Sequence, residues 1–102
     1  MSHKVLTLLG FAQRAGKIVS GEAGVSASIK QKKTYLVLIA QDASDNTKEQ
    51  IKSLCHAFGV HCVEWGSKID IGLSIGKSPR AVIGVMEKSF AEAIGKLLDE
   101  SF

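Results

Sequence analysis

Long apolar runs are the first thing that this sequence lacks. Its longest apolar stretches, Val5–Ala12 and Tyr35–Ala40, are far shorter than the about 20 residues that cross a bilayer as a helix. Apolar residues in the first stretch recur at helical spacing, and Gln13 and Arg14 follow it without a small-residue cleavage site. The sequence therefore predicts no membrane association and no secretory signal, and we expect a cytoplasmic protein.

Cysteine is also scarce. Two cysteines, Cys55 and Cys62, do not make a disulfide scaffold, and we expect both thiols to be reduced and mostly buried. His56 and His61 stand beside them, so the type of side chain would suit zinc. However, a helix turns His56 about 100° away from Cys55, and a strand places His61 and Cys62 on opposite faces. The four side chains cannot converge without distortion, and we expect no metal site.

Motifs for cofactor binding and catalysis are missing. No GxGxxG follows a predicted strand, no GxxxxGK precedes a Ser or Thr, and no serine stands in a nucleophile elbow. Asp42 follows a predicted strand, as a phospho-accepting aspartate would. Such a site needs further carboxylates to hold a divalent metal, yet no acidic residue precedes Glu22. We therefore expect no enzyme and no cofactor, and we interpret Asp42 as a turn residue.

What the sequence does have is an uneven distribution of basic residues. Residues 41–102 carry seven Lys or Arg against nine Asp or Glu, whereas residues 1–40 carry six against Glu22 alone. The six are Lys4, Arg14, Lys17, Lys30, Lys32 and Lys33. A basic first part on a near-neutral remainder indicates a surface that faces a polyanion. A solvated face with chance clustering of lysines would give the same count.

Helix and strand signals alternate along the whole chain. Helices are expected over residues 3–15, about 21–32, 44–58, 67–75 and from Ser89 onward. Strands are expected at Ile18-Val19, Tyr35–Ala40, Val60–Trp65 and Ala81–Met86. The second strand is a continuous apolar run, which is typical of a central strand covered on both faces. This order predicts one α/β domain over residues 1–102, with a largely parallel or mixed four-stranded sheet between helices.

Capping patterns mark where four of these helices begin. Ser20 is the expected N-cap of the second helix. The pairs Asn46 with Glu49, Ser67 with Asp70, and Ser89 with Glu92 have the spacing of capping boxes for the three helices that follow.

The start of the second helix is the first candidate binding site. A helix N-terminus offers unpaired N–H groups and a partial positive charge, which suit phosphate. Gly21 and Gly24 would let a ligand backbone approach closely. Gln13, Arg14 and Lys17 precede this helix, and Lys30, Lys32 and Lys33 follow at its far end. A capped helix with a small-residue packing face explains the same residues equally well.

The loop Gly76–Arg80 is the second candidate site. It joins a short helix to a strand, carries Lys77 and Arg80, and is stiffened by Pro79 next to Ser78. An ordinary turn between a helix and a strand has the same composition.

Three segments carry a resemblance to a known family. They are Leu9–Gly21 (LGFAQRAGKIVSG), Leu36–Thr47 (LVLIAQDASDNT) and Leu73–Gly76 (LSIG). Together they resemble the YlxQ branch of the ribosomal-protein superfamily of L-seven-Ae and L-thirty-e type, and the likeness extends over almost the entire chain. The resemblance implies a three-layer α/β/α sandwich and binding of kink-turn RNA.

The resemblance also implies where RNA would lie. The start of the second helix would meet the kinked backbone and its G·A pairs, and the loop before the last strand would pack on a flipped-out nucleotide. Carried over by position, these contacts fall on Gly21, Glu22, Ala23, Gly24 and Ala27, and on Gly76, Lys77, Ser78, Pro79 and Arg80. Ribosome-associated proteins would be further partners, and no DNA binding is expected.

One departure from the family pattern concerns the helix start. Family members that bind kink-turns commonly have Gly-x-Asn-Glu there and a Lys one turn later. In this sequence the positions of that Asn, Glu and Lys are occupied by Ala23, Gly24 and Ala27. Ala and Gly have no groups that hydrogen-bond base edges. The loop differs as well, because family members often have an apolar loop that contains Glu.

Two hypotheses of different class follow. In the first, the protein binds folded RNA by backbone shape and charge, using Gln13, Arg14, Lys17, Lys30 and Lys32 together with the two candidate sites. With one Trp, one Tyr and four Phe, stacking on single strands is not expected as the main mode. In the second, the protein is an adaptor for other proteins that kept the fold and lost RNA specificity.

Overall fold

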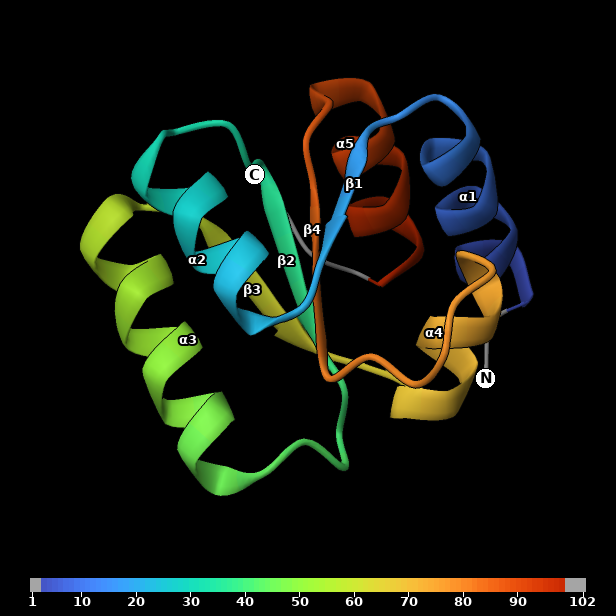
Figure 1. Cartoon of the computed structure of the whole chain (residues 1–102). Helices are drawn as coiled ribbons and strands as arrows, with labels where there is room; N and C mark the ends of the chain where they lie inside the picture. The colour runs from blue at the N-terminus through green and yellow to red at the C-terminus, as the bar shows by residue number, and fades with distance from the viewer. Residues whose placement is uncertain (1–2, 99–102) are drawn as a thin grey trace.

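Five helices and four strands alternate in the computed structural model, which describes residues 3–98 (Figure 1). The helices are α1 (His3–Arg14), α2 (Glu22–Lys30), α3 (Asp45–Phe58), α4 (Lys68–Ser74) and α5 (Lys88–Leu97). The strands are β1 (Ile18–Ser20), β2 (Leu36–Ile39), β3 (His61–Glu64) and β4 (Val82–Val85). The alternation expected from the sequence is confirmed. No helix within residues 3–98 is long and apolar enough to span a membrane.

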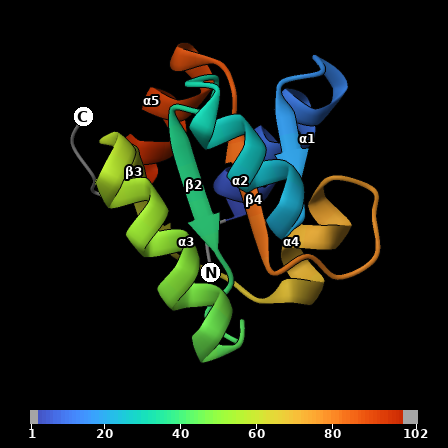
Figure 2. The same ribbon diagram turned by 60° about the vertical axis from the view of Figure 1, so that its left-hand side comes forward.

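The four strands form one mixed sheet in the order β1-β4-β2-β3. β4 pairs antiparallel with both β1 and β2, whereas β3 pairs parallel with β2. Helices α2 and α3 cover one face of the sheet, and α1, α4 and α5 cover the other (Figures 1 and 2). The three-layer α/β/α sandwich with a mixed four-stranded sheet is therefore confirmed.

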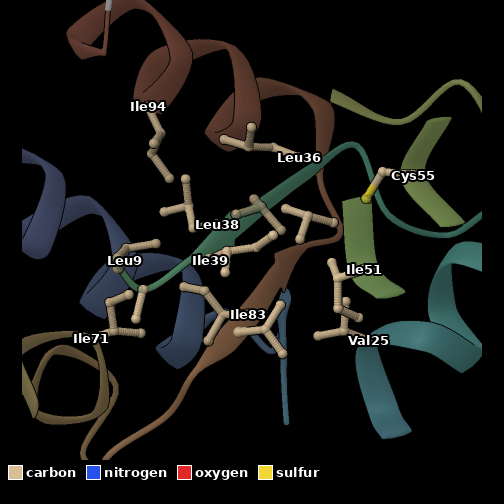
Figure 3. Packing of buried hydrophobic residues seen from close by; sticks show 14 of the residues in the cluster. Leu9, Val25, Leu36, Leu38, Ile39, Ile51, Cys55, Ile71, Ile83 and Ile94 are labelled. Carbon is tan, nitrogen blue, oxygen red and sulfur yellow. The ribbon is translucent and has the colours of Figure 1, made fainter. Parts of the chain in front are cut away.

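The core lies on both sides of the two central strands. Every residue of β2 and β4 is buried, as the continuous apolar run of β2 predicts. Leu9, Ile71 and Ile94 pack on one face of the sheet, and Val25 and Ile51 on the other (Figure 3). Tyr35, at the start of the same run, falls outside the strand and is 47% exposed.

The expected N-cap of α2 is wrong. Ser20 is the last residue of β1 and pairs with Ile83 of β4, so its backbone belongs to the sheet. The cap is Gly21 instead, with a positive φ of 88°, and it makes no side-chain cap bond. α2 is also shorter than expected, because the chain leaves the helix after Lys30.

Two further capping predictions fail, and one holds. The N-cap of α3 lies two residues before Asn46, since the Ser44 hydroxyl accepts a hydrogen bond from the Thr47 amide at 3.1 Å. The N-cap of α5 is Glu87 rather than Ser89, and it makes no side-chain cap bond. The Ser67 hydroxyl does cap α4, by accepting from the Asp70 amide at 3.1 Å.

The strand directions define two opposite ends of the sheet (Figure 1). At the loop end, β1 finishes and β4 starts, so that Gly21 and the loop at residues 76–80 lie there. At the lysine end, β4 finishes and β2 starts, and this end carries Lys17, Lys32, Lys33 and Tyr35. α2 runs from the loop end to the lysine end.

Candidate nucleic-acid interface

The first turn of α2 presents backbone donors at the loop end. The amides of Glu22, Ala23 and Gly24 belong to the first helical turn and have no intrahelical acceptor. No side chain within residues 3–98 caps them, in contrast to the serine caps of α3 and α4. The Gly21 amide is held by the carbonyl of Val82 at 3.0 Å, which fixes the helix start on β4. These donors, with the positive end of the helix dipole, suit an anion.

The loop at residues 76–80 lies tightly on α4. The Lys77 amide donates to the carbonyl of Gly72 at 2.8 Å, and the Arg80 amide donates to the carbonyl of Lys68 at 3.0 Å. A β-carbon at Gly72 would lie 2.2 Å from the carbonyl oxygen of Ser78, so only glycine allows this approach. The loop is therefore held in place by α4, the helix that precedes it.

Arg80 joins the two candidate sites. Its Nε donates to the Ser20 hydroxyl at 3.3 Å, and its guanidinium also donates to the Ser78 hydroxyl at 2.6 Å. Ser20 immediately precedes Gly21, so the loop lies beside the start of α2 (Figure 2). Exposed Lys77 and partly buried Arg80 thus stand next to the free amides.

Glu22 turns away from that surface. Its carboxylate accepts a hydrogen bond from the Thr47 hydroxyl at the start of α3, at 3.3 Å. This leaves Ala23 exposed, and Ala27 and Lys30 follow on the same exposed face of α2. The exposed face therefore has small side chains near the loop end and one cation at the other.

Five of the residues expected at the interface lie away from the loop end. Gln13 and Arg14 end α1, Lys17 precedes β1, Lys30 ends α2 and Lys32 follows it, so all five lie toward the lysine end. The Lys17 carbonyl accepts from the Met86 amide at 2.8 Å, which ties it to the end of β4. The structure thus divides the sequence-predicted residues into two groups at opposite ends of the sheet.

Three contributors to the loop end are not predicted from the sequence. Ser20 was expected to cap a helix but binds Arg80 instead. Gly72 seats the loop, and a glycine inside a helix could have signalled such a close approach. Leu73, which precedes the loop on α4, is 70% exposed, and no periodicity in so short a helix singles it out.

The groups considered for chemistry have structural roles. Asp42 accepts a hydrogen bond from the Lys68 amide at 2.9 Å and so helps to start α4, which fits its interpretation as a turn residue. Cys55 is buried and Cys62 is partly buried, and both are free thiols. A hydrogen bond to Cys62, together with burial, raises the pKa of the Cys55 thiol, so that this sulfur stays protonated at neutral pH.

Comparison with known proteins supports the resemblance. RNA-binding protein YlxQ of Enterococcus faecium is 38% identical over 97 residues, which are 95% of this chain and 93% of that protein. RNA-binding protein YlxQ of Bacillus subtilis (strain 168) is 40% identical over 92 residues, 90% of this chain and 92% of that protein. A solved structure of a protein with unknown function from Bacillus halodurans C superposes with a TM-score of 0.93 at 32% identity, and it covers 97% of this chain and 100% of that one.

A family model matches as well, over nearly the whole of the described chain. The matched segment, residues 3–94, starts with α1 and ends within α5, and so includes both ends of the sheet. This chain belongs to the ribosomal protein L7Ae/L30e/S12e/Gadd45 family.

Proposed function

We propose that this protein binds structured RNA, without catalysis, through the loop end of its sheet. The observation that carries the proposal is the bond between Arg80 and Ser20, which brings the cationic loop beside the open amides of α2. Two relatives of nearly the same length are named RNA-binding proteins, which supports RNA as the ligand.

The recognition chemistry follows from the exposed groups. The amides of Glu22, Ala23 and Gly24 donate to phosphate oxygens, while Lys77 and Arg80 add positive charge beside them. Methyl groups and hydrogens at the exposed positions of α2 do not read base edges. The protein therefore recognises the shape of a folded backbone, and a kink-turn, in ribosomal RNA or elsewhere, is the RNA that the family resemblance favours.

The test is a fluorescence-anisotropy titration with three labelled RNAs: a kink-turn, a matched plain duplex and a single strand, each at two salt concentrations. The proposal predicts tightest binding to the kink-turn and a steep loss of affinity with salt. Equal weak binding to all three would contradict shape recognition. Binding that does not change with salt would contradict phosphate contacts and favour an apolar protein partner, for which exposed Ile69 and Leu73 of α4 are available.

A matched pair of variants locates the contact. Ala23→Asp places a carboxylate in the first turn of α2, where it suits the helix dipole but repels phosphate. We expect affinity for the kink-turn to fall roughly tenfold or more, with no loss of melting temperature. Lys96→Gln lowers the net charge by the same amount, but at the exposed end of α5. It should alter the affinity for the kink-turn less than about twofold. Equal effects of both variants would overturn the assignment to the loop end.

A further inference from the structure

Two hollows adjoin each other at the lysine end. One, of about 460 Å³, is lined by Tyr35, Phe58 and Val60 at the ends of three elements. The other, of about 360 Å³, is lined by Lys17, Lys33 and Tyr35. Lys32 lines both, and Tyr35 also faces both. An apolar, aromatic hollow thus stands directly beside a cationic one.

Lys32 has a backbone conformation that residues other than glycine rarely adopt. Its φ is +60°, and it is the one residue other than glycine with a positive φ in the part of the chain that the structure describes. Its amide donates to the carbonyl of Ile29, and the Lys33 amide donates to the carbonyl of Ser28, each at 3.0 Å. These two bonds make the helix end for which glycine is preferred at the position of Lys32.

A lysine at this position costs stability relative to glycine, because its β-carbon crowds the backbone in the left-handed region. The five other positions with positive φ in residues 3–98 are all glycine. Favourable interaction with the negative end of the helix dipole does not require Lys32, since Lys30 and Lys33 flank the same helix end. A side chain at a strained position where glycine would suffice points to a role for that side chain, and ligand binding is one such role.

The surroundings fit an anion attached to an aromatic ring. Among the described residues, no Asp or Glu lines either hollow. The nearest acidic residue along β4 is Glu87, which follows Met86 and whose carboxylate accepts a hydrogen bond from the Ser89 hydroxyl. Tyr35 and Phe58 are 47% and 41% exposed, so both rings offer open surface.

We propose that the lysine end holds one unpaired nucleotide of an RNA. The base lies in the hollow of Tyr35 and Phe58, and its phosphate is bound by Lys17, Lys32 and Lys33. Aromatic rings stack on any base whose face is free, whereas the bases of a duplex are covered by their neighbours. This contact is separate from the loop end, and the longest principal extent of the Cα trace is 30 Å, so one RNA can reach both.

The experiment uses three probes with the intact protein: labelled decauridylate, a blunt RNA duplex and uridine monophosphate. None of them contains a kink-turn, so a failure of this proposal is distinguishable from a failure of kink-turn recognition at the loop end. At low salt we expect decauridylate to bind at least about fivefold more tightly than the duplex, and uridine monophosphate to compete only weakly. Equal affinity for decauridylate and duplex, or competition by the free nucleotide at equal concentration, would overturn the proposal.

Two variants separate a binding role from a structural one. Lys32→Gly should weaken decauridylate binding about fivefold or more while the melting temperature stays equal or rises, because the strained β-carbon is gone. Tyr35→Leu, which keeps an apolar side chain but removes the ring, should weaken binding similarly. Lys96→Gln is the charge-matched control. A stabilised Lys32→Gly protein with unchanged decauridylate affinity would mean that Lys32 has no ligand there, and the proposal would fail.

Discussion

The two ends of the sheet differ in how they attract an anion. The loop end offers backbone amides with fixed directions, and it carries the acidic residues Glu22 and Asp42 as well as the cations Lys77 and Arg80. The lysine end gathers three lysines around two hollows that no carboxylate lines in residues 3–98, and the helix that starts there, α5, has Glu87 as its N-cap. The two candidate sites therefore differ, because one depends on directional donors and the other on net positive charge.

This separation has its cause in the direction of α2. A helix has open N–H groups and partial positive charge at its start, and open carbonyls and partial negative charge at its end. Lysines are favourable at the helix end, and here they collect at Lys30 and beyond. Geometric recognition is therefore expected at one end and electrostatic attraction at the other.

The largest expected effect on kink-turn affinity comes from a substitution that displaces the loop at residues 76–80 from α4. Gly72→Ala would push its methyl group into the backbone at Ser78 and displace residues 76–80. We expect the free energy of unfolding to fall by about 1–3 kcal/mol and kink-turn affinity to fall at least about tenfold. Chemical denaturation and anisotropy measure the two effects. Decauridylate affinity serves as the internal control, and an equal loss for that probe would mean that the two ends are not independent.

A smaller effect is expected from Arg80→Lys, which keeps the charge but loses the fork that binds Ser20 and Ser78 together. Kink-turn affinity should fall roughly three- to tenfold with little change in its salt dependence, because the number of charges is the same. An affinity equal to that of the unchanged protein would show that charge alone, and not the position of the loop, matters at this end.

The double variant Arg14→Ala with Lys17→Ala should act more weakly on kink-turn RNA, because both residues lie away from the loop end. We expect a loss of about two- to fivefold that is largest at low salt, since these cations act through the general field of the protein. Cys55→Ser should leave RNA affinity intact. If the double variant abolished kink-turn binding, the principal interface would be at the lysine end.

The smallest expected effect is on stability, and it comes from Glu64 rather than from RNA binding at either end of the sheet. Hydrogen bonds from Lys52 and then Lys48 lower the pKa of the Glu64 carboxyl below its ordinary value of 4.5, with Lys48 at 3.1 Å. A lowered native pKa stabilises the fold above pH 4.5, and this contribution is lost as the pH falls through the native value. Glu64→Gln should therefore lower the melting temperature slightly at pH 7 and match the unchanged protein at low pH. A constant difference at all pH values would contradict the ion pairs.

Sequence periodicity predicts the order of the elements but not the details at their ends. The apolar run of β2 and the helical spacing of Ile51 and Cys55 are local signals, and burial confirms them. Ser20 has the composition of a cap, yet its backbone pairs with a strand far along the chain, which local patterns do not contain. The positive φ of Lys32 is equally invisible, since lysine is not a residue that marks that conformation.

The candidate site was predictable only in its parts. The sequence marks the start of α2 and the loop at 76–80 as separate candidates, and only the fold places Arg80 on Ser20. Grouping Lys17 and Lys32 with the start of α2 followed from their closeness along the chain. A helix that runs the length of the sheet puts neighbouring segments at opposite ends of the molecule (Figure 1).

Recognition of RNA by the loop end is tested most directly by a titration of the isotopically labelled protein with kink-turn RNA, in which the amide NMR shifts are followed. We expect the largest shifts on the amides of Glu22, Ala23 and Gly24 and on residues 76–80, with smaller changes elsewhere. If the protein binds the RNA but the amide shifts of the first turn of α2 stay unchanged at saturation, recognition by the loop end would be contradicted.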